Sequence, residues 1–157
     1  MHDIFDLLTH NRDISQSTSK MVRKYCEQWQ ISGFHGLLET HIFDEGALAD
    51  LLANHLKMDR VYTIFSNASG MKARKNISYE QAKEWECFPS MIMEDTGWVE
   101  IVIADPTKRN RVDYLRQVFK QGVHFSVGAR CDIIRAIDEY YSIEDQLSFL
   151  SQVNPKV

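Results

Sequence analysis

Three of the six histidines are the residues nearest to a metal-ligand arrangement. His35 and His41 lie close together in the sequence, and His55 follows on the next predicted helix. Three imidazoles can hold a zinc ion. No cysteine or carboxylate pattern accompanies them, so we expect no metal site and interpret these histidines as surface or half-buried side chains.

The cysteines exclude a second kind of chemistry. Cys26, Cys87 and Cys131 are odd in number and far apart, which is incompatible with a CxxC motif or a disulfide framework. The chain begins Met1-His2-Asp3, without the basic and apolar segments of a secretory signal. Together these features predict a reducing, cytoplasmic location.

Catalytic constellations are weak throughout the chain. Ser126 precedes Val127-Gly128 but lacks a G-x-S-x-G elbow. The acidic pairs are adjacent residues, whose side chains diverge on a helix or turn: Asp44-Glu45, Glu94-Asp95, Asp138-Glu139 and Glu144-Asp145. We therefore predict no catalytic residue, no cofactor and no enzymatic activity.

The composition indicates one soluble globular domain covering residues 1–157. The chain is 44% apolar and 25% charged, which is typical of a domain with its own core. The formal net charge of −4 argues against a nucleic-acid partner held by bulk charge. No apolar run is long enough to cross a bilayer.

Residues 1–58 are predicted to be a helical part. Apolar spacing indicates helices over residues 3–30, with a polar break at Asn11–Ser19. Gly33 and Gly36 are interpreted as the end of that region. Asp44 is expected to cap a further helix that carries its leucines on one face.

Residues 59–150 are predicted to be an α/β part, followed by a polar tail at 151–157. Four apolar runs favour strands: 61–65, 87–93, 98–104 and 123–127. Residues 66–76 are expected to form a surface loop. Ser78 begins a capping box. Thr107 or Asn110 is expected to cap a helix that ends near Gly122, and a last helix covers 132–141, with 142–150 either extending it or forming a turn.

The order of these elements predicts an α+β fold. We expect an N-terminal helical subdomain followed by a small, mainly antiparallel sheet with helices packed on it. Residues 87–93 and 98–104 should form a hairpin around the polar turn that ends at Gly97. We find no internal repeat.

Several segments, in this order and spacing, resemble the N-terminal domain of type II secretion and type IV pilus assembly ATPases, called the MshEN domain. The resemblance covers residues 31 to 141. Its most specific part is a strand ending Ala-Asp-Pro-Thr, an amphipathic helix, a strand, and a final helix ending Tyr-Tyr. The segments are Leu37–Leu56, Ile77–Lys83, Ile101–Thr107 and Asp132–Tyr141.

The resemblance implies a domain without catalysis of its own. In the family it docks the ATPase onto an inner-membrane platform protein, while ATP hydrolysis belongs to a separate module with a Gly-x-x-x-x-Gly-Lys-Ser/Thr loop. No Gly-Lys dipeptide occurs in this chain. The chain is therefore either a free-standing domain or a fragment of a longer ATPase.

A subset of the family binds cyclic di-GMP through a motif with arginine, glycine and glutamine at fixed positions. Its apolar positions are retained here, but the ligand-reading positions differ, and no second copy of the motif precedes this one. Cyclic di-GMP binding through a degenerate motif is thus the alternative function. Its positions are Ser32 in place of arginine, Phe34 and His41 in place of glycine, and Ala47 and His55 in place of glutamine.

Protein docking is the function that the resemblance favours. The expected partner is an inner-membrane platform or motor protein of a secretion or pilus system, and the chain would be cytoplasmic, either free or peripheral at the inner membrane through that partner. A stand-alone interaction protein of another machine is the other alternative, and the oligomeric state is left open. The predicted partner-binding residues are Arg109, Arg116, Lys120 and Arg135.

Overall fold

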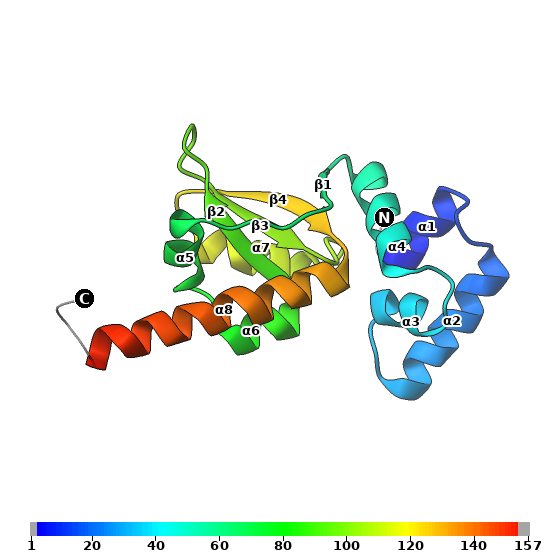
Figure 1. The fold of residues 1–157 in the computed structure, drawn as a ribbon. Helices are drawn as coiled ribbons and strands as arrows, with labels where there is room; N and C mark the ends of the chain where they lie inside the picture. Colours follow the sequence, from blue (N-terminus) through cyan, green and yellow to red (C-terminus); the bar gives the residue numbers. More distant parts are fainter. Residues whose placement is uncertain (1–2, 154–157) are drawn as a thin grey trace.

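The computed structural model describes residues 3–153 as helices packed beside and around one small sheet (Figure 1). None of the helices in this range is long and apolar enough to cross a membrane. The elements, in chain order, are α1 (Ile4–His10), α2 (Gln16–Trp29), α3 (Gly33–Glu39), α4 (Glu45–Leu56), β1 (Asp59–Val61), α5 (Ala68–Arg74), α6 (Tyr79–Trp85), β2 (Cys87–Ile92), β3 (Val99–Ile103), α7 (Arg109–Val118), β4 (Val123–Gly128) and α8 (Arg130–Val153).

The α+β fold class is confirmed, but the sheet is mixed. Its strand order is β1-β4-β3-β2. The β2–β3 hairpin is antiparallel as predicted, whereas β4 pairs in parallel with both β3 and β1. The expectation of a mainly antiparallel sheet was therefore wrong. Helix α7 carries the chain back across the sheet between β3 and β4, and such a crossover makes the two strands parallel.

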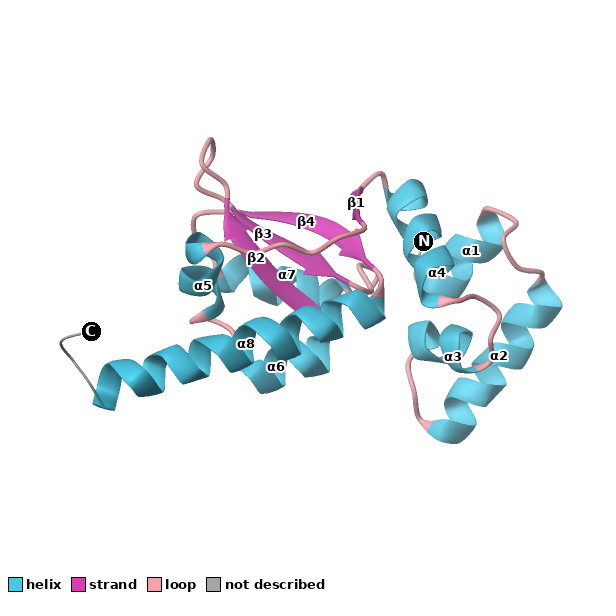
Figure 2. Cartoon of the chain, viewed as in Figure 1, coloured by secondary structure: helices cyan, strands magenta, loops and turns pink. Residues whose placement is uncertain are grey.

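Helices α7 and α8 cover opposite faces of the sheet, which Figure 2 shows behind and in front of the strands. Arg116 of α7 stacks over Phe125 of β4. Ile133 of α8 packs where a side chain at Gly128 of β4 would lie. Positions 125 and 128 point to opposite faces because strand side chains alternate. Buried side chains from both layers form the core together with the strands.

The helical part is built from two similar helical hairpins, α1–α2 and α3–α4, which corrects the expectation of no internal repeat. Both have a seven-residue first helix, a turn with a left-handed residue, and a capped second helix. Equivalent positions are 29 residues apart, which is the separation of the first N-caps, Asp3 and Ser32. The equivalent pairs are the N-caps Asp3 and Ser32, the left-handed residues Arg12 and His41, and the N-caps Ser15 and Asp44. The repeat lies in backbone and caps rather than in residue identity.

Helix α3 was missed because its glycines were interpreted as a helix end. Helix α2 ends instead at Gln30, which adopts the left-handed conformation. Gly36 lies inside α3, where a β-carbon would come within 2.2 Å of the Cys26 sulfur. The glycine is therefore needed for the close approach of α3 to α2, not for helix termination.

Two further predictions in the α/β part were wrong. The first strand lies at residues 59–61 rather than 61–65, because its partner β4 ends at Gly128, opposite Val61. The predicted loop at 66–76 contains α5, which packs against β2. Its N-cap, Asn67, accepts a hydrogen bond from the Gly70 amide at 3.1 Å.

Some of the predicted helix ends agree with the structure and others do not. Asp44 and Ser78 cap α4 and α6 as predicted, accepting bonds from Ala47 and Gln81. The N-cap of α7 is Lys108, which makes no side-chain cap bond, so neither Thr107 nor Asn110 caps this helix as predicted. Residues 142–150 extend α8, which continues to Val153. The predicted tail thus begins inside this helix, and residues 154–157 lie outside the described range.

Candidate functional site

A groove runs between the end of α4 and helix α7, over the outer part of β4. Its floor is apolar and its rim is charged. Half-buried Leu56 and Met58 come from the helical part, and Val112 comes from α7. The complete lining is Leu56, Met58, Pro106, Arg109, Val112, Asp113, Arg116, Val123, His124 and Phe125.

Two arginines define the chemistry of this groove. Arg109 and Arg116 are seven residues apart on α7, and two helical turns place them along the same side. The Arg116 guanidinium lies 5.3 Å from the centre of the Phe125 ring, which holds it over the floor. Asp113 is the one carboxylate among the lining residues. The groove can therefore accept an apolar side chain and carboxylates on the same partner segment.

The groove is braced where the two parts of the chain meet. His124 of β4 and Asp59 of β1 are joined through Nε2 and Oδ2 at 2.9 Å. Arg60 donates from Nε to Asp50 of α4 at 2.8 Å. These contacts tie β1 to the strand beneath the groove and to the helix beside it.

The four predicted partner-binding residues do not form one surface. Arg109 and Arg116 line the groove, and Lys120 is exposed in the turn that follows α7. Arg135 belongs to α8 on the opposite face, where it pairs with Asp132 at 3.5 Å. A single partner segment in the groove would contact the α7 residues only.

The five positions of the degenerate cyclic di-GMP motif have structural roles in the two hairpins. Ser32 caps α3 by accepting from the His35 amide at 3.2 Å, and Phe34 is buried. His41 occupies the left-handed turn, and Ala47 donates its amide to the α4 cap. His55 Nε2 lies 2.6 Å from Asp13 Oδ2, which joins α4 to the first hairpin.

The histidines do not gather into a metal site. Within residues 3–153, no group of three or more histidine, cysteine or acidic side chains is placed to hold a metal ion. His35 pairs with Glu86 and His55 pairs with Asp13, so each lies beside a different carboxylate.

Two of the tryptophans have different surroundings. Trp29 is 59% exposed, whereas Trp85 packs on Tyr114 of α7 with ring centres 4.9 Å apart.

The Asp-Pro-Thr turn places a buried carboxylate at the start of α7. Asp105 is only 7% exposed, and its Oδ1 accepts from the Thr107 amide at 3.0 Å. The Thr107 hydroxyl also donates to Asp105, so it is used here instead of capping the helix. Burial raises the pKa of Asp105, although the bonds from Thr107 oppose that shift.

We expect Asp105→Asn to change how stability depends on pH. An acid whose pKa is raised on folding stabilises the fold fully below its unfolded pKa, and this contribution is lost as the pH rises through the folded value. The stability of the natural protein should therefore fall relative to Asp105→Asn as the pH rises above about 4, the ordinary pKa of an aspartate. Urea unfolding at a series of increasing pH values measures the difference, with exposed Asp113→Asn as the control. A difference independent of pH would contradict the prediction.

Sequence reasoning missed two buried charged residues, Arg74 and Glu86. Arg74 lies in the segment predicted as a loop, yet it is 3% exposed. Glu86 follows α6 with a left-handed backbone and is 5% exposed. Neither has a local signal, because their partners are distant in the sequence: Arg74 contacts Glu144, and Glu86 contacts His35 and Arg130.

Comparisons with known proteins agree with the earlier resemblance. The sequence profile of the MshEN domain matches residues 66–147, which is 82 of 157 residues and begins later than the resemblance at residue 31. No curated protein matches the sequence significantly.

Solved structures with a similar fold support this match. One, described as MshE with cdg, has a TM-score of 0.66 and 16% identity over 87% of this chain and 97% of that chain. Two crystal forms of the N-terminal domain of XpsE have 18% identity, with TM-scores of 0.58 and 0.64. They cover 86% and 87% of this chain and 92% of each matched chain. At these identities, the structures establish the shared fold.

Proposed function

This chain belongs to the MshEN domain family, and on that premise we propose that it is a non-catalytic docking domain of a type II secretion or type IV pilus system. In this proposal, the groove between α4 and α7 binds a cytoplasmic segment of an inner-membrane platform or motor protein. The domain would then act at the cytoplasmic side of the membrane through its partner. Its work is to bind and position, without chemistry of its own.

The pair of arginines over an apolar floor is the observation that carries this proposal. Arg109 and Arg116 lie along one side of α7, and stacking on Phe125 holds the second of them in place. An arginine that is already ordered loses less conformational freedom when it pairs with a carboxylate. The groove suits an acidic segment with apolar side chains facing Leu56 and Met58.

Cyclic di-GMP binding is the weaker alternative. This chain shares the fold of a structure described as MshE with cdg. However, the motif positions that should read the ligand are used for capping and packing here, as at Ser32 and Phe34. A rise in Tm with micromolar cyclic di-GMP, absent with unrelated nucleotides, would reverse this order.

We expect the double variant Arg109→Glu, Arg116→Glu to bind the cytoplasmic region of the platform protein at least about tenfold more weakly than the natural chain. Reversal of both charges repels an acidic segment and removes the stacked guanidinium. Titration calorimetry with that purified region from the same organism measures the effect. Binding of the natural chain should also weaken at higher salt.

The control is Arg135→Glu, which reverses one charge of the same kind on the opposite face. It should bind within about twofold of the natural chain if the groove is the docking site. Undiminished binding by the double variant would overturn the assignment of the groove. Absence of binding by the natural chain would overturn the proposed partner.

A further inference from the structure

The two halves of β4 have different neighbours in the sheet. Strand β3 pairs with residues 123–127 of β4, whereas the three residues of β1 pair only with residues 126–128. In the described part of the chain, residues 123–125 therefore have a strand on one side only. The open edge of a strand carries free backbone donors and acceptors, and segments of other chains bind such edges as additional strands.

The direction of the backbone shows which groups are free on this edge. The Val99 amide of β3 donates to the Gly122 carbonyl at 3.0 Å. Because a trans peptide bond points the next amide the opposite way, the Val123 amide points away from β3, and strand alternation does the same for Phe125. Within residues 3–153, no turn, loop or cap bond reaches the backbone of these two residues. The Val123 amide and carbonyl and the Phe125 amide are therefore unpaired there.

The segment that precedes β1 does not cover these groups. Lys57 adopts the left-handed conformation at the end of α4, and the Met58 amide donates to the Ala53 carbonyl at 2.9 Å. The chain thus turns back onto α4 and enters the sheet only at Asp59. Residues 123–125 gain no backbone partner from it.

The open edge lies inside the groove between α4 and α7. Val123, His124 and Phe125 all line this groove, together with Leu56 and Met58. Successive side chains of a strand point to opposite faces, so a groove that contacts all three strand residues runs along the edge of β4. The groove has a volume of about 510 Å³, which lies within the range of sites that bind ligands.

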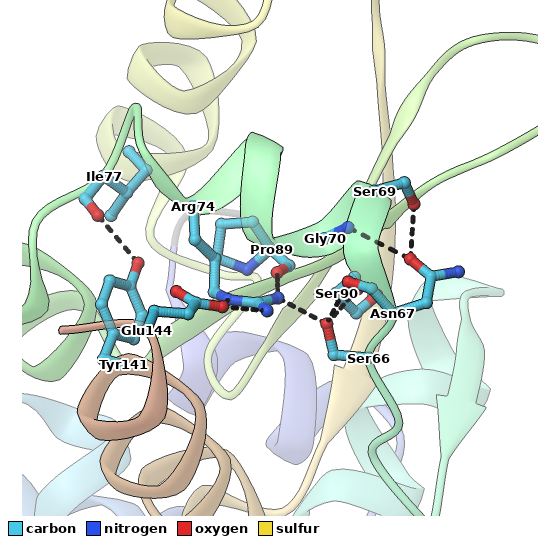
Figure 3. Close-up of polar contacts among 10 residues, drawn as sticks. All are labelled: Ser66, Asn67, Ser69, Gly70, Arg74, Ile77, Pro89, Ser90, Tyr141 and Glu144. Atoms are coloured by element: carbon cyan, nitrogen blue, oxygen red, sulfur yellow. Dashed lines mark hydrogen bonds and ion pairs between the residues drawn. The ribbon is translucent and has the colours of Figure 1, made fainter. Parts of the chain in front are cut away.

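The edge strand at the other side of the sheet, β2, is covered by side chains. The Arg74 guanidinium donates to the Pro89 carbonyl, and the Ser66 hydroxyl donates to the Ser90 carbonyl, each at 2.8 Å (Figure 3). Such contacts satisfy backbone groups that another strand would otherwise bind. Among the described residues, no side chain covers residues 123–125 in this way.

We propose that the groove binds its partner segment as an extended strand, which pairs in parallel with residues 123–125 of β4 and in line with β1. This inference rests on the proposed function, because it gives the form in which the partner segment enters the same groove. One partner residue, opposite His124, donates its amide to the Val123 carbonyl and accepts from the Phe125 amide. A helix could not do this, because its own backbone groups are bonded internally.

The arginines of α7 select the side chain that follows this central residue. The next partner residue lies opposite Phe125, and residues that are paired across two strands point to the same face. The Phe125 ring lies beneath the Arg116 guanidinium, so the partner side chain also points toward α7. An acidic residue at this position pairs with Arg116.

The probe is the hexapeptide acetyl-Ser-Thr-Val-Glu-Thr-Ser-amide, titrated into the isotopically labelled natural chain and followed by NMR. We expect the largest shifts at the Val123 and Phe125 amides. Methylation of the valine nitrogen removes the donor to the Val123 carbonyl and should weaken binding at least about tenfold. Methylation of the glutamate nitrogen is the matched control, because this amide points away from β4, and it should change the affinity by less than about twofold.

A pair of protein variants tests the acidic position. Arg116→Glu should bind the unmodified peptide at least about fivefold more weakly than the natural chain does. Arg135→Glu reverses one charge on the opposite face and should bind the peptide as the natural chain does. Both arginines are exposed, and unchanged Tm values would confirm that folding is intact.

Strand pairing and docking of the platform protein can fail separately. Equal binding of the two methylated peptides would overturn strand pairing even if the platform region binds in the groove. The expected order of the peptides, without binding of the platform region, would support the strand site and overturn only the proposed partner.

Three other results would overturn the inference. The first is no binding of the unmodified peptide at millimolar concentration. The second is a greater loss from glutamate methylation than from valine methylation, which contradicts the parallel register. The third is self-association of the natural chain that the unmodified peptide reverses, which would make a second copy the occupant of the edge.

Discussion

Replacing Arg74 by alanine is expected to lower the free energy of unfolding by about 3–5 kcal/mol. Its side chain is 2% exposed and bonds three different segments. It donates to Ser66 Oγ at 2.6 Å, to the Pro89 carbonyl at 2.8 Å and to Glu144 at 2.8 Å. The guanidinium also lies 4.8 Å from the centre of the Phe88 ring. Alanine would leave the acceptors without their donor and open a cavity beside β2.

Urea unfolding monitored by circular dichroism measures this loss. Arg135→Ala is the matched control, since Arg135 is exposed on α8 and makes one ion pair among the described residues, so its effect should stay below about 0.5 kcal/mol. The double variant Arg74→Met, Glu144→Leu should recover part of the stability because it removes both charges and refills the space. A loss below about 1 kcal/mol for Arg74→Ala would contradict the role assigned to this residue.

The second large effect is expected at the junction of the helical and α/β parts. Glu86 has a side chain 6% exposed, and its two oxygens pair with His35 of α3 and Arg130 of α8. Arg130 also approaches Glu45 of α4 at 3.5 Å. Arg130→Met should lower the free energy of unfolding by about 2 kcal/mol, because a buried carboxylate then loses its permanent cation.

A double-mutant cycle separates this loss from simple side-chain truncation. Glu86→Gln combined with Arg130→Met should be less destabilising than the sum of the two single changes, since no uncompensated carboxylate is left. Lys24→Met, at an exposed position of α2, is the control. Hydrogen exchange should be faster in α3 and α4 of Arg130→Met. Strict additivity in the cycle would show that Glu86 and Arg130 are not coupled.

Both clusters join helices that are distant in the sequence. Arg74 holds α8 beside α5. The Glu86 cluster joins α3 and α4 to α8, while the groove lies where the end of α4 meets α7. Variants at the clusters test stability, whereas variants at Arg109 and Arg116 test binding, and the two sets should give separate results.

Local features of this chain were predictable because their causes lie within a few residues. Asp44 and Ser78 cap their helices through bonds that span three residues, and each cap was identified from the sequence. The turn ending at Gly97 predicted the β2–β3 hairpin, whose strands are adjacent in the chain. The order of such local elements was also enough for the α+β class and for the family resemblance.

Features that depend on distant partners were not predictable in this way. Val61 ends β1 because β4 ends opposite it, 67 residues later at Gly128. The segment around Arg74 was predicted to be a loop, yet its arginine is buried beside Glu144, 70 residues away. The candidate site shows the same difference between local and distant relations. Arg109 and Arg116 lie on the same side of one helix, as their spacing predicts, whereas the sheet separates Arg135 from them.

The sequence by itself determined α4 and α6 with their caps, the hairpin, the fold class and the placement of Arg109 and Arg116 on one helix, since each depends on contacts between near neighbours in the chain. Tertiary structure alone decided the parallel pairing of β4, the second copy of the helical hairpin and the burial of Arg74 and Glu86. It also decided that Arg135 of α8 lies on the opposite side of the sheet from Arg109 and Arg116 of α7. These outcomes depend on contacts between elements that are distant in the chain. The periodicity and spacing of residues in one sequence indicate local structure but do not indicate such contacts.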